Sequence, residues 1–451
     1  MGNSATVKRG SETYRLVFKT LIAMSIPTIL EEVLSTLIQY VDTAMVGRLG
    51  EEATAAVSTT TTINWLIHSV PAAIGVAVLA IAAKAMGAGD EKKLRRVSGQ
   101  AILLAFSSGI IIEIIAILLS PYIPIWMGAA ENIQADATMY FAILSTSLFL
   151  RTSSRIFAAS IRATKDTKTP MRISLLENLL NVVLNWTFIY GLSMGVKGAA
   201  IASAISYAIG GLLMYVAFRR NKNLKCDFQN IKPDREILAE TVKIGMPALG
   251  TTFVSCMGYV VFAGMVSGMG TTIFAAHSIA VAAEEIVYIP GYGLRMATSS
   301  LVGNALGEKD IPKLKITEEI SIIITVLIMV INGILLYVFA NPLMSVFTKS
   351  MNVINLGADM LKMVAFSEPF FGLMIVLEGI EYGLGRTKTV FYIEAFSMWC
   401  IRILATFICV KIMHLSLYAV WGCMIADNVC KALLLLLALI KKRQQSLYKE
   451  S

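Results

Sequence analysis

The sequence predicts an all-α polytopic membrane protein with about twelve transmembrane helices, arranged as two lobes of six. Three observations support this fold class. The 451 residues are 56% hydrophobic and only 15% charged, whereas a soluble chain carries about a quarter charged residues. Apolar runs long enough to cross a bilayer alternate with short charged loops. Landmark residues also recur at a constant distance in the two halves of the chain, which indicates an internal duplication.

The composition also argues against other classes of protein. The net charge of +9 comes from basic residues in the loops rather than on one face, so we expect no nucleic-acid partner. The six cysteines are scattered without a CxxC pair and fit the pattern of small packing residues. The histidines are His68, His277 and His414, and none has an acid five residues later. We therefore expect no enzyme, with no catalytic residue, no metal site and no cofactor.

The predicted spans follow one another along each half of the chain. In the first half they cover approximately 17–47, 53–83, 95–119, 133–161, 170–191 and 197–218. In the second half they cover approximately 236–268, 273–305, 315–341, 353–383, 388–411 and 416–440. The polar segment 219–235 separates the two sets, so the predicted domains are an N-lobe (1–218), a linker (219–235) and a C-lobe (236–451).

The charge of the loops predicts the orientation. Lys and Arg gather in 84–96, 162–172, 219–235, 309–315, 386–388 and 441–443, whereas the connections 121–132 and 268–272 contain neither. Cytoplasmic loops are the ones enriched in Lys and Arg. Both termini and the linker are therefore predicted to lie in the cytoplasm, with the chain in the plasma (cell inner) membrane.

A shift of 220 residues aligns the two halves without gaps at several landmarks. The aligned landmarks include Pro27 with Pro247, Gly50 with Gly270, Asp90 with Asp310, and Thr167–Thr169 with Thr387–Thr389. Near the ends the shift becomes 224, which pairs 195–202 with 419–426. Because each half holds an even number of spans, the two halves keep the same orientation, related by a pseudo-two-fold axis along the membrane normal. Parallel repeats around a shared site are a transporter architecture.

The stretch Ser25–Gly50 combines a proline with an intramembrane acid. Pro27 removes a backbone donor and builds a potential bend into the first span. Asp42 lies fifteen positions further on, and an ionised carboxylate at such a depth is a functional candidate by default. The alternative is an aspartate solvated at the outer membrane interface beside Arg48.

Several motifs occur in the same order as in a known family. They are QYVDTAMVGRLG, AKAMGAGDEKKLRR, TKDTKTPMRI, NVVLN followed by GVKGAAIASAIS, and AAHSIAVAAEE with LVGNALGEKD downstream. With these motifs the chain resembles the MATE family of multidrug and toxic compound extrusion transporters, from about residue 15 to 440. Within the family it looks closer to the DinF-like branch than to the NorM-like branch. The resemblance implies two six-helix lobes and an alternating-access mechanism.

The resemblance also implies functional residues in the N-lobe. The family's first-span aspartate matches Asp42, and its bending proline, the expected hinge, matches Pro27. Its fifth-span pair matches Asn181 and Asn185, and its sixth-span hydroxyl matches Ser203. Residues i and i+4 share one face of a helix, so both amides can face a single carboxylate. This set is the expected proton-coupling and substrate site.

In the C-lobe the family's eighth-span acid matches Glu284, with Glu285 beside it. Adjacent residues on a helix face different ways, so we expect at most one of the pair to point straight into a cavity. Asp427 stands at the position equivalent to Ser203 and is a secondary candidate. The acids of the NorM-like sodium site are not reproduced, because Ser255 stands at the seventh-span position.

The resemblance predicts a secondary active antiporter that exports cationic, amphipathic drugs or toxic compounds in exchange for protons or sodium ions. The alternative is a flippase or exporter of a lipid-linked or metabolite substrate from the same superfamily. A cavity for a lipid-linked sugar would be strongly cationic to hold pyrophosphate, whereas the identifiable midspan charges here are mostly acidic. We expect a monomer that works in a lipid bilayer on small-molecule substrates.

Overall fold

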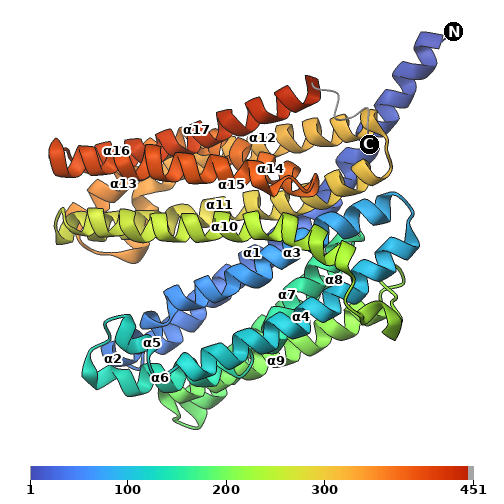
Figure 1. Ribbon diagram of the computed structural model, residues 1–451. Helices are drawn as coiled ribbons and strands as arrows, with labels where there is room; N and C mark the ends of the chain where they lie inside the picture. Colours follow the sequence, from blue (N-terminus) through green and yellow to red (C-terminus); the bar gives the residue numbers. More distant parts are fainter. Residues whose placement is uncertain (1, 445–451) are drawn as a thin grey trace. The chain divides into compact units, whose positions relative to one another are not determined.

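The computed structural model describes residues 2–444, and in that range the regular structure is helical with no strand. Figure 1 shows the succession of long helices along the chain. The first half contains α1 (Gly2–Gly47), α2 (Glu51–Thr59), α3 (Thr61–Gly87), α4 (Glu91–Leu119), α5 (Ile123–Trp126), α6 (Glu131–Ser145), α7 (Leu148–Ala163), α8 (Lys168–Asn185), the π-helix η1 (Trp186–Gly191), α9 (Gly195–Arg220) and the 3₁₀ turn η2 (Phe228–Ile231).

The second half repeats this succession. It contains α10 (Arg235–Ser267), α11 (Thr271–Gly307), α12 (Ile311–Phe347), α13 (Met351–Ala365), α14 (Glu368–Gly383), α15 (Thr387–Phe396), the π-helix η3 (Ser397–Ile403), α16 (Leu404–Phe407), the π-helix η4 (Ile408–Ile412) and α17 (Leu417–Gln444). Aligned residues start aligned helices. Asp90 accepts a hydrogen bond from the backbone of Lys93 at 2.9 Å, and Asp310 accepts one from Lys313 at 2.9 Å. Both are N-caps, which satisfy a free amide at a helix start.

Nine helical segments of the described range are long and apolar enough to cross a membrane, or eleven when each of two bent pairs counts as one span. Every predicted span coincides with helix in the structure. The prediction of an all-α, polytopic membrane protein is confirmed.

Two predicted spans are pairs of helices with a sharp bend between them. The 133–161 span bends by 49° between α6 and α7, and the 353–383 span bends by 58° between α13 and α14. The two breaks are aligned in the duplication, because Ser147 and Ser367 differ by 220. Each serine hydroxyl donates to the carbonyl three residues earlier, at 2.9 Å in both cases. The hydroxyls therefore satisfy carbonyls that the interrupted helix leaves free.

The chain forms two compact units whose limits differ from the predicted domains. The N-terminal unit is Leu30–Gly245, and the C-terminal unit combines the residues up to Ile29 with those from Met246 on. Each unit therefore contains one helical arm from the other half of the sequence: the first part of α1 and the first part of α10. The limits predicted at 218 and 236 stay predictions.

Each unit has its own apolar core. The N-terminal core gathers buried residues of α3, α4, α7 and α9, with the rings of Phe157 and Phe218 4.8 Å apart. The arm from α10 contributes Ile237 and Ile244 to it. In the C-terminal unit the arm from α1 packs Leu21 against residues of α11 and α12. Burial of these apolar faces stabilises each unit.

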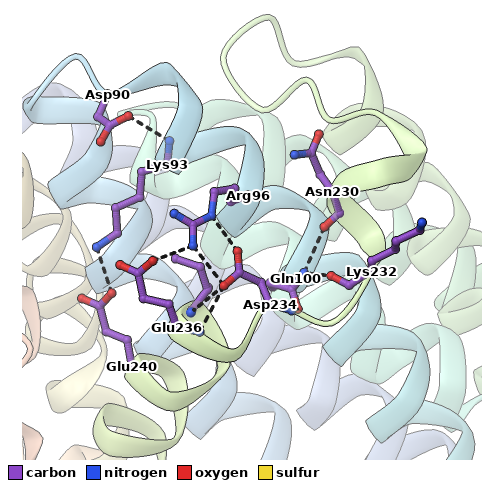
Figure 2. Close-up of polar contacts among 10 residues, drawn as sticks. Asp90, Lys93, Arg96, Gln100, Asn230, Lys232, Asp234, Glu236 and Glu240 are labelled. Carbon is purple, nitrogen blue, oxygen red and sulfur yellow. Dashed lines mark hydrogen bonds and ion pairs between the residues drawn. The ribbon is translucent and has the colours of Figure 1, made fainter.

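The linker is fixed to α4 by ion pairs (Figure 2). The guanidinium of Arg96 contacts Asp234 at 2.6 Å and Glu236 at 2.6 Å, and Lys93 contacts Glu240 at 2.9 Å. Asp234 lies just before α10, and its hydrogen bond with Arg96 lowers the pKa of its carboxyl below the usual value. The end of the linker is thus held against the N-terminal unit by charge.

Hydrogen bonds to the linker backbone complete this attachment. Gln100 donates from Nε2 to the carbonyl oxygens of Asn230 at 2.9 Å and Lys232 at 2.7 Å (Figure 2). It also accepts from the backbone of Asp234 at 3.1 Å. Gly99 lets the linker come close, because a Cβ there would lie 2.0 Å from the Asn230 oxygen.

Candidate functional site

Four predicted residues form one hydrogen-bonded chain in the N-terminal unit. Asn185 donates from Nδ2 to the Asp42 carboxylate and to Asn181 Oδ1, the latter at 3.1 Å. Asn181 donates in turn to the Ser203 hydroxyl at 3.1 Å. The structure therefore brings together the acid, both amides and the hydroxyl that the sequence singled out.

Three helices position these side chains. Asp42 lies near the end of α1, the two asparagines lie one turn apart on α8, and Ser203 lies on α9. Asn185 is the last residue of α8, and the π-helix η1 begins at the next residue. Single π-turns inside helices are frequent at functional sites.

The hydrogen-bonded side chains of this site differ in burial. Asn185 is fully buried and Ser203 is 4% exposed, whereas Asp42 keeps part of its surface open. The Asn185 Oδ1 atom has no hydrogen-bond donor within the described part of the chain. The site thus offers an accessible acid, backed by buried neutral amides, and one free acceptor.

Sequence analysis missed two tyrosines beside this site. Tyr140 on α6 and Tyr207 on α9 both interact electrostatically with Asp42. The guanidinium of Arg151 lies 3.9 Å from the centre of the Tyr207 ring, a cation–π contact. No spacing rule links these residues to Asp42, because the helices that carry them come together only in the fold.

Pro27 lies in the part of α1 that belongs to the C-terminal unit, two residues before the division at Ile29. The aligned Pro247 lies on α10, two residues after the corresponding division at Gly245. Each proline removes one hydrogen bond from its helix. Both long helices that pass from one unit to the other are therefore weakened near the point of passage.

The two adjacent glutamates of α11 have different environments. Glu284 is 2% exposed and accepts a hydrogen bond from Tyr288, whereas Glu285 is exposed. The ring of Tyr288 stacks on Phe371 of α14 with centroids 3.8 Å apart. Glu284 is therefore enclosed in its unit and Glu285 is not, and a role for either in a cavity stays a prediction.

A second buried glutamate interacts with Glu284. Glu368, the first residue of α14, is fully buried and interacts electrostatically with Glu284. Neither of its carboxylate oxygens has a hydrogen-bond partner in the part of the chain that the structure describes. Its position at a helix start favours a negative charge. No motif or spacing in the sequence assigns a role to Glu368.

Asp427 is held by basic side chains. Its Oδ2 atom lies 2.8 Å from Arg402 Nε and 3.0 Å from Lys431 Nζ, and Ser397 donates to its Oδ1 at 2.6 Å. It is fully buried. Asp427 is therefore part of an ion-pair network rather than an open acid like Asp42. Among the described residues no group of three His, Cys, Asp or Glu is arranged to hold a metal ion.

Comparisons with known proteins agree with this geometry. The model of the MatE family matches the chain twice, over residues 27–187 and 247–408. The two matches start at Pro27 and Pro247, the same shift of 220 that relates the two halves. The prediction of a duplication is thereby supported by a second, independent observation.

Curated relatives align over nearly their whole length. The probable multidrug resistance protein NorM of Thermotoga maritima is 29% identical over 430 residues, which are 93% of this chain and 91% of that protein. The probable multidrug resistance protein YoeA of Bacillus subtilis is 24% identical over 414 residues, which are 90% of this chain and 89% of that protein. The branch within the family stays a prediction.

Solved structures show the same fold. A mutant of the Vibrio cholerae MATE transporter VcmN has a TM-score of 0.92 at 20% identity and covers 98% of this chain and 100% of its own. A MOP superfamily transporter from Pyrococcus furiosus has a TM-score of 0.89 at 22% identity, covering 96% and 97%. The fold, the duplicated match and the relatives agree: the chain belongs to the MatE family of transporters, not to a family of enzymes.

Proposed function

We propose that this transporter is a secondary active antiporter that exports cationic, amphipathic compounds, coupled to protons at Asp42. The observation that carries the proposal is the hydrogen-bonded chain from Asp42 through Asn185 and Asn181 to Ser203. It places one partly open acid among neutral donors. The multidrug resistance proteins among its relatives are consistent with such substrates.

The ionised form of the site suits a cationic substrate. A carboxylate that accepts hydrogen bonds from an amide keeps its charge. The donors that reach Asp42 are neutral, so they leave its negative charge uncancelled. Coulomb attraction to an organic cation is stronger in a poorly solvated site than in bulk water. The ionised site therefore binds the drug.

The protonated form suits release. A neutral carboxylic acid no longer attracts the cation, and it is cheap to keep away from water. The amide of Asn185 can rotate and present its free Oδ1 to the new hydroxyl of Asp42. The amide of Asn181 then rotates as well, so that it donates to Asn185 Oδ1 and accepts from the Ser203 hydroxyl. Protonation thus exchanges an acceptor for a donor at the same place, and the four-residue chain stays intact.

Coupling requires the proton and the drug to favour different states of one element. The first span is that element in this proposal, because it carries both Asp42 and Pro27. Pro27 acts as the hinge, since the missing hydrogen bond lowers the cost of a bend there. Binding at Asp42 and bending at Pro27 then belong to one switch.

The test is ethidium efflux by Asp42→Asn in proteoliposomes, with the proton and sodium gradients imposed separately. We expect normal insertion and the loss of proton-driven efflux. Asp136→Asn is the matched control, because Asp136 is an exposed acid on α6 of the same unit. It should transport like the unchanged chain.

Two results would contradict the proposal. Full proton-driven efflux by Asp42→Asn would end the role of this residue. An unchanged rate in the wild-type chain after collapse of the proton gradient, with sodium supplied, would move the coupling to a sodium site.

The proposal includes a monomer in the plasma membrane with both termini and the linker in the cytoplasm. The orientation rests on the basic loops of the sequence. In a chain freed of its own cysteines, Lys222→Cys provides an exposed probe in the linker. A thiol reagent that cannot cross the membrane should label it only after the cells are opened, and labelling in intact cells would reverse the orientation.

A further inference from the structure

The C-terminal unit holds a buried network of two cations and two anions. Arg402 of η3 contacts Asp427 of α17 at 2.8 Å, and Lys431 of α17 contacts Asp427 at 3.0 Å and Glu394 of α15 at 2.9 Å. The exposed fraction of each of the four residues is 5% or less. The formal charges cancel within the network, as buried charges require.

The duplication indicates which part of the repeat holds this network. The halves align at a shift of 220 up to Thr389 and at 224 from Ala419 on, so the second half has four extra residues between them (224 − 220 = 4). The π-helix η3 lies in this stretch, whereas its counterpart in α8 is α-helical. A π-turn accommodates one extra residue. With one extra residue in η3, the shift between the halves becomes 221 at Arg402. Arg402 then aligns with Asn181 (402 − 221 = 181).

The contacts agree with this alignment. Asp427 aligns with Ser203 at the shift of 224. Asn181 contacts Ser203 at 3.1 Å in the N-terminal unit, and Arg402 contacts Asp427 at 2.8 Å in the C-terminal unit. The same two positions of the repeat are therefore bonded in both units. A neutral pair in one corresponds to an ion pair in the other.

The coupling acid has an aromatic counterpart. Phe262 aligns with Asp42 at the shift of 220 and is 3% exposed. The guanidinium carbon of Arg402 lies 5.7 Å from the centre of its ring and 5.2 Å from that of Tyr259. Aromatic faces attract a guanidinium. The C-terminal repeat thus surrounds a covalently attached cation with groups that attract cations.

We propose that the guanidinium of Arg402 is a built-in occupant of the C-terminal counterpart of the Asp42 site, and that it keeps protons and other monovalent cations off Asp427 throughout transport. Lys431 does the same for Glu394. This inference rests on the proposed function of Asp42 as the coupling residue. It explains why only one of two duplicated sites exchanges its cation: in the other the cation is part of the chain.

Other titratable groups surround the network and are unchanged in every variant of the infrared experiment. They are Tyr259 of α10, His277, Glu284 and Tyr288 of α11, and Glu378 and Tyr382 of α14, all of which interact electrostatically with Arg402, Lys431 or Glu394. Because they are common to the variants, a difference between two variants reports the altered residue.

The experiment removes the occupant from a chain whose N-terminal site cannot titrate. Infrared difference spectra of the purified full chain, between about pH 8 and about pH 5, report newly protonated carboxyl groups. Relative to Asp42→Asn alone, the double variant with Arg402→Gln should gain a protonated-carboxyl band. Arg402→Lys keeps the charge and should gain none. Adding Asp427→Asn should abolish the new band.

A second measurement does not depend on the stability of the arginine variant. Asp427→Asn in the otherwise unchanged chain should remove no band over this pH range, because Asp427 stays ionised there. Loss of a band would show that Asp427 titrates beside an intact Arg402, and it would overturn the inference. Absence of a new band in a folded Arg402→Gln chain, or its survival after Asp427→Asn, would do the same.

The infrared experiment and the efflux experiment test the two proposals separately. The infrared band belongs to Asp427 and is measured without a substrate or a gradient. Proton-driven ethidium efflux by Asp42→Asn would end the coupling proposal whatever the spectra show. Intact coupling at Asp42 together with a titrating Asp427 would end only the inference about Arg402.

Discussion

At the scale of single residues, the candidate site depends on buried side chains that hold one another in position. Asn185 uses one amide group to contact both Asp42 and Asn181. Ser203 is the last member, and it accepts from Asn181. A substitution of Ser203 can therefore affect the hydrogen bonding of Asp42 only through the two asparagines between them.

Ser203→Ala tests this transmission. Loss of one hydrogen bond costs about 1 kcal/mol, so we expect about five-fold weaker ethidium binding where Asp42 is ionised. Fluorescence titration of the purified chain measures it. Ser206→Ala is the matched control, because the Ser206 hydroxyl bonds only the Ala202 carbonyl of its own helix, at 2.8 Å. Equal effects of the two variants would contradict a specific role for Ser203.

The glutamates of α11 give a second prediction. Glu284 is buried beside Tyr288, and Glu285 is exposed. Glu284→Gln should weaken resistance of cells to cationic compounds at normal expression, because it removes a charge that a low-dielectric surrounding makes effective. Glu285→Gln is the control and should leave resistance unchanged. If both variants transport at the wild-type rate, the acid of the proposed site is Asp42 alone.

Sequence reasoning finds those site residues that a local rule describes. The i, i+4 spacing identifies Asn181 and Asn185, and an acid in an apolar run identifies Asp42. The role of Asp427 could not be found in this way. Its ion pair with Arg402 depends on η3. The shift between the halves changes from 220 to 224 between Thr389 and Ala419, but the sequence does not locate the π-turn within that stretch, so it does not give the register of the helix.

At the scale of elements, the linker is attached to α4 by the carboxylate of Asp234 (Figure 2). Arg96 lowers the pKa of this carboxyl in the folded state. Such a group stabilises the fold above the usual aspartate pKa of about 3.9, and the stabilisation is lost as the pH falls towards the folded value.

We therefore expect the linker to detach in acid. Cleavage of the linker by pepsin, which works in acid, should rise as the pH falls below about 4. Asp234→Asn should raise cleavage already at the upper end of this range. Asp227→Asn is the control, because Asp227 is an exposed acid in the same linker. Identical profiles for the wild type and Asp234→Asn would contradict an electrostatic attachment.

Hydrophobic runs locate every membrane helix but do not reveal its interruptions. The breaks after α6 and α13 fall at Ser147 and Ser367, whereas other serines such as Ser206 lie inside unbroken helices. Only their hydrogen bonds to carbonyls three residues earlier distinguish them. Such bonds compete with the helix in any local context, so the fold decides which serine ends a helix.

At the scale of the whole molecule, the helices α1 and α10 pass from one unit to the other beside aligned prolines. A proline inside a helix costs about 3 kcal/mol. Pro27→Ala and Pro247→Ala restore the hydrogen bond and should each raise thermal stability while slowing efflux. Thermal unfolding and ethidium efflux in proteoliposomes measure the two effects.

Pro71→Ala is the matched control for both prolines. Pro71 also lies inside a helix, α3, but that helix belongs to one unit throughout. Its replacement should change stability without slowing efflux. A similar slowing by all three variants would contradict a hinge at the passage points and would point to a general effect of stiffer helices.

The exchanged arms determine whether the halves can exist as separate proteins. A cut in the linker would leave the α1 arm, with Leu21, on the first fragment, although its apolar partners lie in the second half. The second fragment would keep the α10 arm, whose Ile237 and Ile244 belong to the core of the first half. Each fragment would expose one unpartnered apolar face and lack part of its own core. A chain that reads as a tandem duplication is therefore not two modules in series, and its halves depend on mutual complementation to fold.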